Sequence, residues 1–450
     1  MSAIALGRLV QEGWASSRMV TEAHLNRIAA VDPSAVTVVE VFGDAALAAA
    51  DAADQAVRAG SRSSVLRGVP FTIRHNTDSG ASSEGVAGAA RPACDEPPLD
   101  RLRRHGAIAV GQTRSPDRGF RWDNDLASDV VVEPGDGNRV AGCSGDAAAV
   151  AAGMTPLAVG DDDGGSLRLA AQAQGVSCLR LTCGRVATGS SSLAQPSLAL
   201  QLFTVPGFTA RRVPDLAAAL QAAAGSTDGD PRIRPVPLHG PPWPHRVAVI
   251  SDAGEAADAH LAQGIRRAAD ALADAGYQVD EAKVPNVEEA ASTWAALVAA
   301  EGRLNPVFWY QRISPDTQAC DDDAHQVDGI DHQRYAKALT QQRAQALAWA
   351  RLQRQYPIIL GPVATFAPHA AQAASSTGVE TEQTQAAGLV AAFSLIDLPV
   401  VVMPVTTASG PPQAVQVAAP RWRDDIALAA AQEIEQRLPP TAHAIRHARV

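Results

Sequence analysis

The sequence predicts an α/β fold, because short apolar strands alternate along the chain with amphipathic or Ala-rich helices. One strand is expected at 69–73 and another at 107–110, the second directly after a helix over 99–105 that a glycine closes. A helix over 146–153 and a strand over 156–159 repeat this order. In such sheets the polar groups that follow the strands meet at one edge, so ligand groups are expected there.

The remaining segments are consistent with one α/β domain over residues 1–450. The first 60 residues have helical apolar spacing, and 224–246 is a connector rich in Pro and Gly. Beyond it the pattern of strands and helices continues, with a buried strand over 398–402 and a closing helix over 424–437. No internal repeat separates the two halves, so we expect the connector to lie within a single domain.

Composition excludes several classes of protein. The 38 basic side chains against 48 acidic ones give a net charge of −10, so a broad nucleic-acid-binding face is not expected. No apolar run reaches the roughly 18 residues of a membrane helix, and the amino terminus has no signal-peptide pattern. The 5 cysteines are scattered and odd in number, which predicts a reducing, cytoplasmic setting.

The strongest local motif is the run 160–166, expected as a tight turn that ends in Gly164, Gly165 and Ser166. Two glycines let successive N–H groups point into one concavity, and the helix that follows adds a positive dipole end. A serine there can attack a carbonyl while the N–H groups of residues Asp163 to Ser166 receive the oxyanion. The commoner use of such a serine is to cap the helix, and both interpretations remain open.

Other chemistries are less well supported at this turn. A phosphate loop would have a lysine after the glycines, whereas Leu167 and Arg168 follow here. The consecutive carboxylates at 161–163 point in different directions and lack the alternating spacing of a calcium loop, and those at 321–323 are typical of a solvated loop. No metal ion or other cofactor is therefore expected.

Several ordered motifs match one family. Residues 66–76 are similar to LxGVPFxIKDN, 102–113 to LRxAGAxxxGKT, and 146–168 to an Ala-rich helix, a strand and a DxGGSxR turn. Further segments match at 175–186, 203–216, 398–405 and 420–422. Over nearly its whole length the chain thus resembles the amidase signature family of serine hydrolases. The resemblance implies a large twisted mixed sheet flanked by helices on both faces, no cofactor, and a possible homodimer.

The family mechanism carries over only in part. In the family a neutral lysine deprotonates a serine held by a cis peptide bond, which relays the proton from the nucleophilic serine. The nucleophile maps to Ser166, but the lysine position is Arg74, whose guanidinium cannot be deprotonated in a protein. The relay serine maps to Gly142 without a gap; with two glycines deleted it maps to Cys143, and Ser144 is then the second loop serine.

Three functions remain open. The first is hydrolysis of an amide or ester through a Ser166 acyl-enzyme, with His75, Cys143 or Ser144 in place of the lysine. His75 directly follows Arg74, and neighbours on a strand face opposite sides, so one of the two is expected to point away from a shared site. The second is acyl transfer to a nucleophile other than water, with Arg74 holding a substrate carboxylate. The third is a catalytically inactive protein that binds a ligand or acts as a scaffold.

The expected ligand is a small-molecule amide or ester. His75, Trp122 and Asn124 are the candidate substrate-binding residues. Trp122 and Asn124 lie in the loop-like stretch before the altered relay motif, where they can line a substrate pocket. An exposed aromatic on the surface is an equally good interpretation of Trp122. No nucleic-acid or membrane partner is expected.

Overall fold

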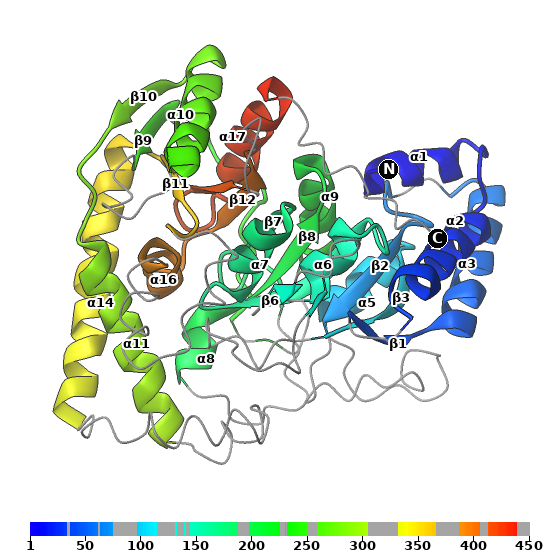
Figure 1. Cartoon of the computed structure of the whole chain (residues 1–450), viewed down its shortest axis with the longest axis horizontal. Coiled ribbons are helices and arrows are strands. Elements are labelled where there is room, and N and C mark those ends of the chain that lie inside the picture. The colour runs from blue at the N-terminus through cyan, green and yellow to red at the C-terminus, as the bar shows by residue number, and fades with distance from the viewer. Residues whose placement is uncertain are drawn as a thin grey trace.

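The structure is a computed structural model in which one long sheet runs through the molecule between helices (Figure 1). It describes residues 1–33, 37–61, 64–74, 97–114, 131–132, 139–140, 145–187, 198–225, 230, 232–250, 259–304, 332–365, 387–405 and 413–438.

The sheet has 11 strands, in the order β1, β3, β2, β6, β8, β7, β12, β13, β11, β9, β10. Its strands are β1 (Val38–Val41), β2 (Pro70–Arg74), β3 (Ile108–Thr113), β6 (Leu157–Asp163), β7 (Ser177–Arg180), β8 (Thr204–Ala210), β9 (Arg246–Val249), β10 (Gln278–Glu281), β11 (Ile358–Pro362), β12 (Val400–Pro404) and β13 (Ala414–Ala418). A separate two-stranded ladder joins β4 (Val131–Val132) to β5 (Arg139–Val140).

The pairing is mixed, as the family resemblance implies. Strand β2 runs parallel to both β3 and β6, whereas β8 runs antiparallel to β6 and β7. At the other end, β9 is parallel to β10 and β11, and β13 is antiparallel to β11 and β12. The carboxyl ends of β2, β3, β6 and β7 therefore meet at one edge of the sheet, where Arg74 and Ser166 lie.

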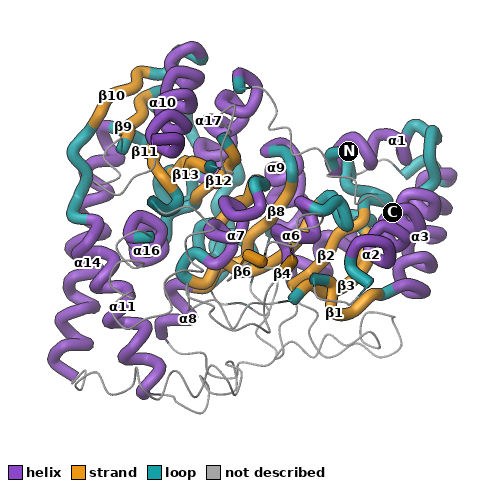
Figure 2. The backbone as a smooth tube through the Cα atoms, in the orientation of Figure 1, coloured by secondary structure: helices purple, strands orange, loops and turns teal. Residues whose placement is uncertain are grey.

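Helices cover both faces (Figure 2). One apolar core joins α1 (Ala3–Gln11), α5 (Pro97–Arg104), α9 (Val213–Ala223), α10 (Ala259–Asp274) and α17 (Asp424–Arg437) to the sheet. The core on the opposite face contains α6 (Gly145–Ala151), α7 (Ser166–Gln174), α8 (Leu198–Phe203), α11 (Val287–Leu304), α14 (His332–Gln355) and α16 (Gly388–Leu395). A third cluster packs α2 (Ser17–Val31) and α3 (Gly43–Arg58) beside β3. No helix of the described ranges is both long and apolar enough to cross a membrane.

The expected α/β class is confirmed, and alternation explains which side chains face which layer. In β6, Leu157 and Val159 belong to the first core, and Ala158 belongs to the second. Gly160 and Asp162 are therefore on the side of α7. The same alternation in β2 puts Phe71 in the first core and turns Arg74 toward α7.

One expectation was wrong in its bounds. Residues 160–163 continue strand β6 rather than opening a tight turn, because they pair with Gly207 through Thr204 of β8. The turn itself is only Gly164 and Gly165. The first 60 residues also contain the edge strand β1, which the helical spacing did not indicate.

Candidate active site

Ser166 is placed by a two-glycine turn at the amino terminus of α7. Gly164 and Gly165 have φ values of 67° and 118°, in the left-handed region that side chains other than glycine rarely adopt. A Cβ on Gly164 would lie 2.2 Å from Cζ2 of Trp294, and one on Gly165 would lie 2.0 Å from Cγ1 of Val390. The turn therefore requires both glycines, and it leaves the Ser166 residue 7% exposed.

Arg74 reaches the Ser166 hydroxyl from the end of β2. Its Nη1 donates to the Asp161 carbonyl oxygen at 2.6 Å and lies 3.4 Å from Oγ of Ser166. The Ser166 hydroxyl in turn donates to the Asp161 carbonyl at 3.2 Å. The structure thus brings the predicted nucleophile into contact with the residue that replaces the family lysine.

The counterion of Arg74 is Asp146, in the first turn of α6. Nε of Arg74 lies 2.8 Å from Oδ2 of Asp146, and the Asp146 side chain is 0% exposed. The Thr113 hydroxyl, at the end of β3, donates to Oδ1 of the same carboxylate. Gly160 allows this contact, because a Cβ there would lie 2.3 Å from Oδ2 of Asp146.

The role of Asp146 was missed in the sequence. An acidic residue in the first turn of a helix is common because the positive end of the helix dipole stabilises its charge. The position of Asp146 alone therefore does not indicate a buried partner. The available signal was that the rest of α6 is glycine, alanine and valine, which predicts burial of the whole helix. A buried carboxylate needs a cation, and Arg74 is a candidate.

A second buried ion pair holds the far side of the turn. Nε of Arg168 lies 2.8 Å from Oδ2 of Asp162, and both side chains are 0% exposed. Arg168 also donates to the Val390 carbonyl at 3.0 Å and to the Ser394 hydroxyl at 2.6 Å. Arg168 thus holds Asp162 and ties the start of α7 to α16.

Burial and charge act in opposite directions on these groups. Burial by itself would raise the pKa of Asp162, but the charge and hydrogen bonds of Arg168, followed by Arg180 and the Gly165 N–H, hold the pKa below its usual value. Burial lowers the pKa of Arg180, which Asp162 partly offsets. Burial also raises the pKa of the Cys178 thiol, which is fully buried in the apolar core.

Several predicted site residues lie outside the described residues: His75, Trp122, Asn124, Gly142, Cys143 and Ser144. Their roles stay predictions. The amides of residues 163–166 likewise remain the predicted oxyanion donors. Within the described ranges, no group of three or more His, Cys, Asp or Glu side chains is arranged to hold a metal ion.

Comparison with known proteins shows the family to which this chain belongs. The family described as Amidase matches residues 19–428. The chain is 32% identical to an indoleacetamide hydrolase of Bradyrhizobium diazoefficiens over 98% of this chain and 87% of that protein. It is 31% identical to an indoleacetamide hydrolase of Bradyrhizobium japonicum over 78% of this chain and 77% of that protein. The solved structure of a bacterial aryl acylamidase superposes with a TM-score of 0.77 at 18% identity, covering 97% of this chain and 96% of the other.

The fold and the glycine turn thus define an α/β protein of the amidase class. The chain belongs to the amidase signature family, whose hydrolases act on amides.

Proposed function

We propose that this protein is an acyl hydrolase in which Ser166 is the nucleophile and Arg74 is a fixed cation beside it rather than a base. The observation that carries the proposal is the contact of 3.4 Å between Nη1 of Arg74 and Oγ of Ser166, at the end of the intact glycine turn. A guanidinium so close favours the partial negative charge that the hydroxyl oxygen develops as it attacks. The ion pair with Asp146 keeps that guanidinium in place.

The mechanism follows from what Arg74 can and cannot do. Oγ of Ser166 forms a bond to the acyl carbon and its proton passes to solvent, because a guanidinium accepts none. The amides of residues 163–166 receive the oxyanion, the bond to the leaving group breaks, and water then hydrolyses the acyl-enzyme to release the acid. An amine must be protonated to leave, whereas a phenolate leaves without a proton. Activated esters should therefore react faster than amides.

The relatives suggest the acyl group. The protein that shares 32% identity over 98% of this chain is an indoleacetamide hydrolase. We propose an arylacetic or similar acyl group, presented as an ester or an amide. Acyl transfer to a nucleophile other than water uses the same intermediate and is part of this proposal.

A specific observation also favours a second candidate, a ligand-binding protein without turnover. The guanidinium of Arg74 occupies the place of the family lysine, and loss of one member of a catalytic unit costs about 10⁴ to 10⁶ in rate. In this case the buried site around Ser166 and Arg74 would hold a ligand without turning it over.

The experiment is intact-mass analysis after treatment with a fluorophosphonate, for the unaltered protein and for Ser166→Ala and Cys143→Ala. A mass increase that only Ser166→Ala abolishes supports the hydrolase. With p-nitrophenyl phenylacetate and the matching p-nitroanilide, the ester should react faster, beyond its intrinsic reactivity, by about 10² to 10⁴, the usual contribution of general acid–base catalysis. Absence of labelling and of ester turnover would favour the ligand-binding protein.

Three further properties are proposed on smaller grounds. The single domain is supported by one sheet that takes strands from both halves of the chain, from β1 to β13. A reducing cytoplasm is supported by the free thiols of Cys178 and Cys183. A homodimer is proposed from the family resemblance alone, and sedimentation would test it.

A further inference from the structure

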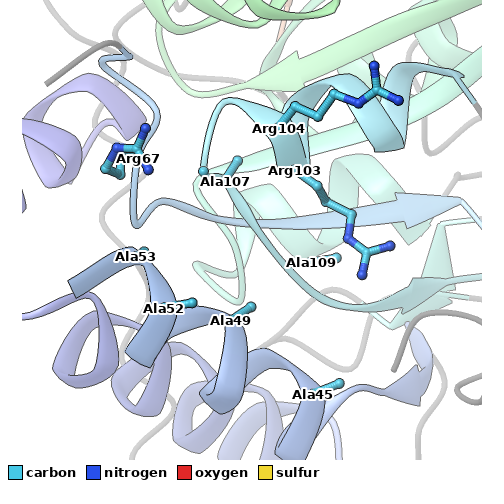
Figure 3. Close-up of a pocket in the computed structure, with 10 residues that line it drawn as sticks. Ala45, Ala49, Ala52, Ala53, Arg67, Arg103, Arg104, Ala107 and Ala109 are labelled. Carbon is cyan, nitrogen blue, oxygen red and sulfur yellow. The ribbon is translucent and has the colours of Figure 1, made fainter. Parts of the chain in front are cut away.

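A hollow lies away from Ser166, between α3, α5 and the start of β3 (Figure 3). Its volume is about 250 Å³. Its lining combines one row of alanines with three arginines: Ala45, Ala49, Ala52, Ala53, Arg67, Arg103, Arg104, Gly106, Ala107 and Ala109. We call it the alanine–arginine groove.

The floor of the groove is apolar and shallow because alanine is all that α3 presents there. Ala45, Ala49, Ala52 and Ala53 recur at helical spacing along one side of the helix. From Ala45 to Ala53 this row extends about 12 Å, at 1.5 Å per residue. Such short side chains cannot fill the space below α5, so they leave a flat apolar surface that suits a planar ring.

The walls are cationic. In Figure 3 the Arg67 side chain lies near the Ala53 end of the row and Arg103 lies toward the Ala45 end. The ten described residues that line the groove include no acidic side chain. Arg104 forms an ion pair with Asp100 one turn earlier in α5, and Arg67 and Arg103 have interactions of their own, but a guanidinium has five donors and one partner does not use them all. Three guanidinium side chains thus line one hollow of a protein whose net charge is −10.

The groove and the Ser166 site lie at opposite ends of the same strands. Ala107 and Ala109 are at the amino end of β3, whereas Thr113, which holds Asp146, is at its carboxyl end. The two ends are separated by about 17 Å, at 3.3 Å per residue over five residues. A ligand in the groove therefore does not touch Ser166.

We propose that the alanine–arginine groove binds a small organic carboxylate with a planar apolar body. The ring lies on the alanine row of α3, and the carboxylate accepts hydrogen bonds from the guanidinium groups above it, chiefly Arg103. Neither half of this ligand suffices alone, since the floor offers no hydrogen-bond donor and the walls offer little apolar area. The proposal is independent of any chemistry at Ser166.

Calorimetric titration of the full chain tests this, with phenylacetate as the probe, phenylacetamide as its neutral counterpart, and inorganic phosphate as an anion without a ring. The groove, identified as the binding that Arg103→Gln weakens, should take phenylacetate at least tenfold more tightly than either of the other two. Added salt should weaken it, because the guanidinium groups at the groove are partly exposed.

Two variants locate the site. Arg103→Gln removes a wall charge, and Ala49→Glu puts a carboxylate on the exposed part of the floor; each should weaken phenylacetate at least tenfold. Arg266→Gln, an exposed arginine on α10, is the matched control and should change nothing. Thermal unfolding of each variant shows that the fold is retained.

The proposal is overturned if phenylacetate does not bind, or if Arg103→Gln and Ala49→Glu both bind it as the unaltered protein does. It is also overturned if phenylacetamide or phosphate binds at the groove, with an affinity that Arg103→Gln weakens, as tightly as phenylacetate does. The first result would show that the carboxylate charge is not recognised, and the second that the ring is not recognised.

Discussion

The pairing of Arg74 with Asp146 predicts that Arg74→Lys alone will not restore a proton acceptor at Ser166. The Asp146 side chain is fully buried, and its Oδ2 lies 2.8 Å from Nε of Arg74. An ammonium introduced about 4 Å from this carboxylate gains about 4 kcal/mol at an effective dielectric constant of about 20. That energy lowers the neutral fraction of the introduced amine by a factor of about 10³.

The double variant Arg74→Lys/Asp146→Asn removes this effect, and desolvation then favours the neutral amine. We expect the double variant to label Ser166 with a fluorophosphonate about 10²-fold faster than Arg74→Lys at pH 8, at the lower end of what a general base contributes. The assay is a time course of intact mass between pH 6 and 10. Asp146→Asn, which keeps the guanidinium, is the matched control and should not label faster than the unaltered protein.

Equal labelling rates for Arg74→Lys and the double variant would refute the reasoning, because Asp146 would then have no influence on the introduced amine. A fast Asp146→Asn control would refute it as well, since the guanidinium would not be what prevents proton transfer.

The remaining predictions concern stability and reactivity. Asp162→Asn leaves the Arg168 charge buried without its counterion and should lower the free energy of unfolding at pH 7, measured with denaturant, by about 3–5 kcal/mol. Because the pKa of Asp162 is lowered in the folded protein, the stabilisation by the ion pair is complete above about pH 4 and is lost as the pH falls below it. The difference between variant and parent should therefore shrink at pH 3. Gly164→Ala should lower the melting temperature more than Gly13→Ala, because both glycines have positive φ but only the first would place a Cβ against a side chain, 2.2 Å from Trp294; an equal loss would contradict this. Burial raises the pKa of the Cys178 thiol, so a disulfide reagent should modify it only after unfolding, which mass mapping with and without denaturant would check.

The sequence determined the class of fold and the position of the glycine turn that precedes Ser166. Local patterns carry both, because the strands at β2 and β6 are short apolar runs and the turn before Ser166 needs two adjacent glycines. The helix α17 was predicted with the bounds that the structure has, 424–437.

Tertiary structure decided what local patterns do not contain. Residues 160–163 read as a turn because Gly and Asp disfavour strands, yet pairing with β8 makes them strand. Likewise, Asp146 is 72 residues from Arg74 in the chain, and only the packing of α6 against β2 and β6 brings them together. An ion pair between a strand and a helix that covers it leaves no periodic trace in the sequence, because each partner reads locally as an ordinary polar residue. Burial against the other elements is what forces the two charges to meet.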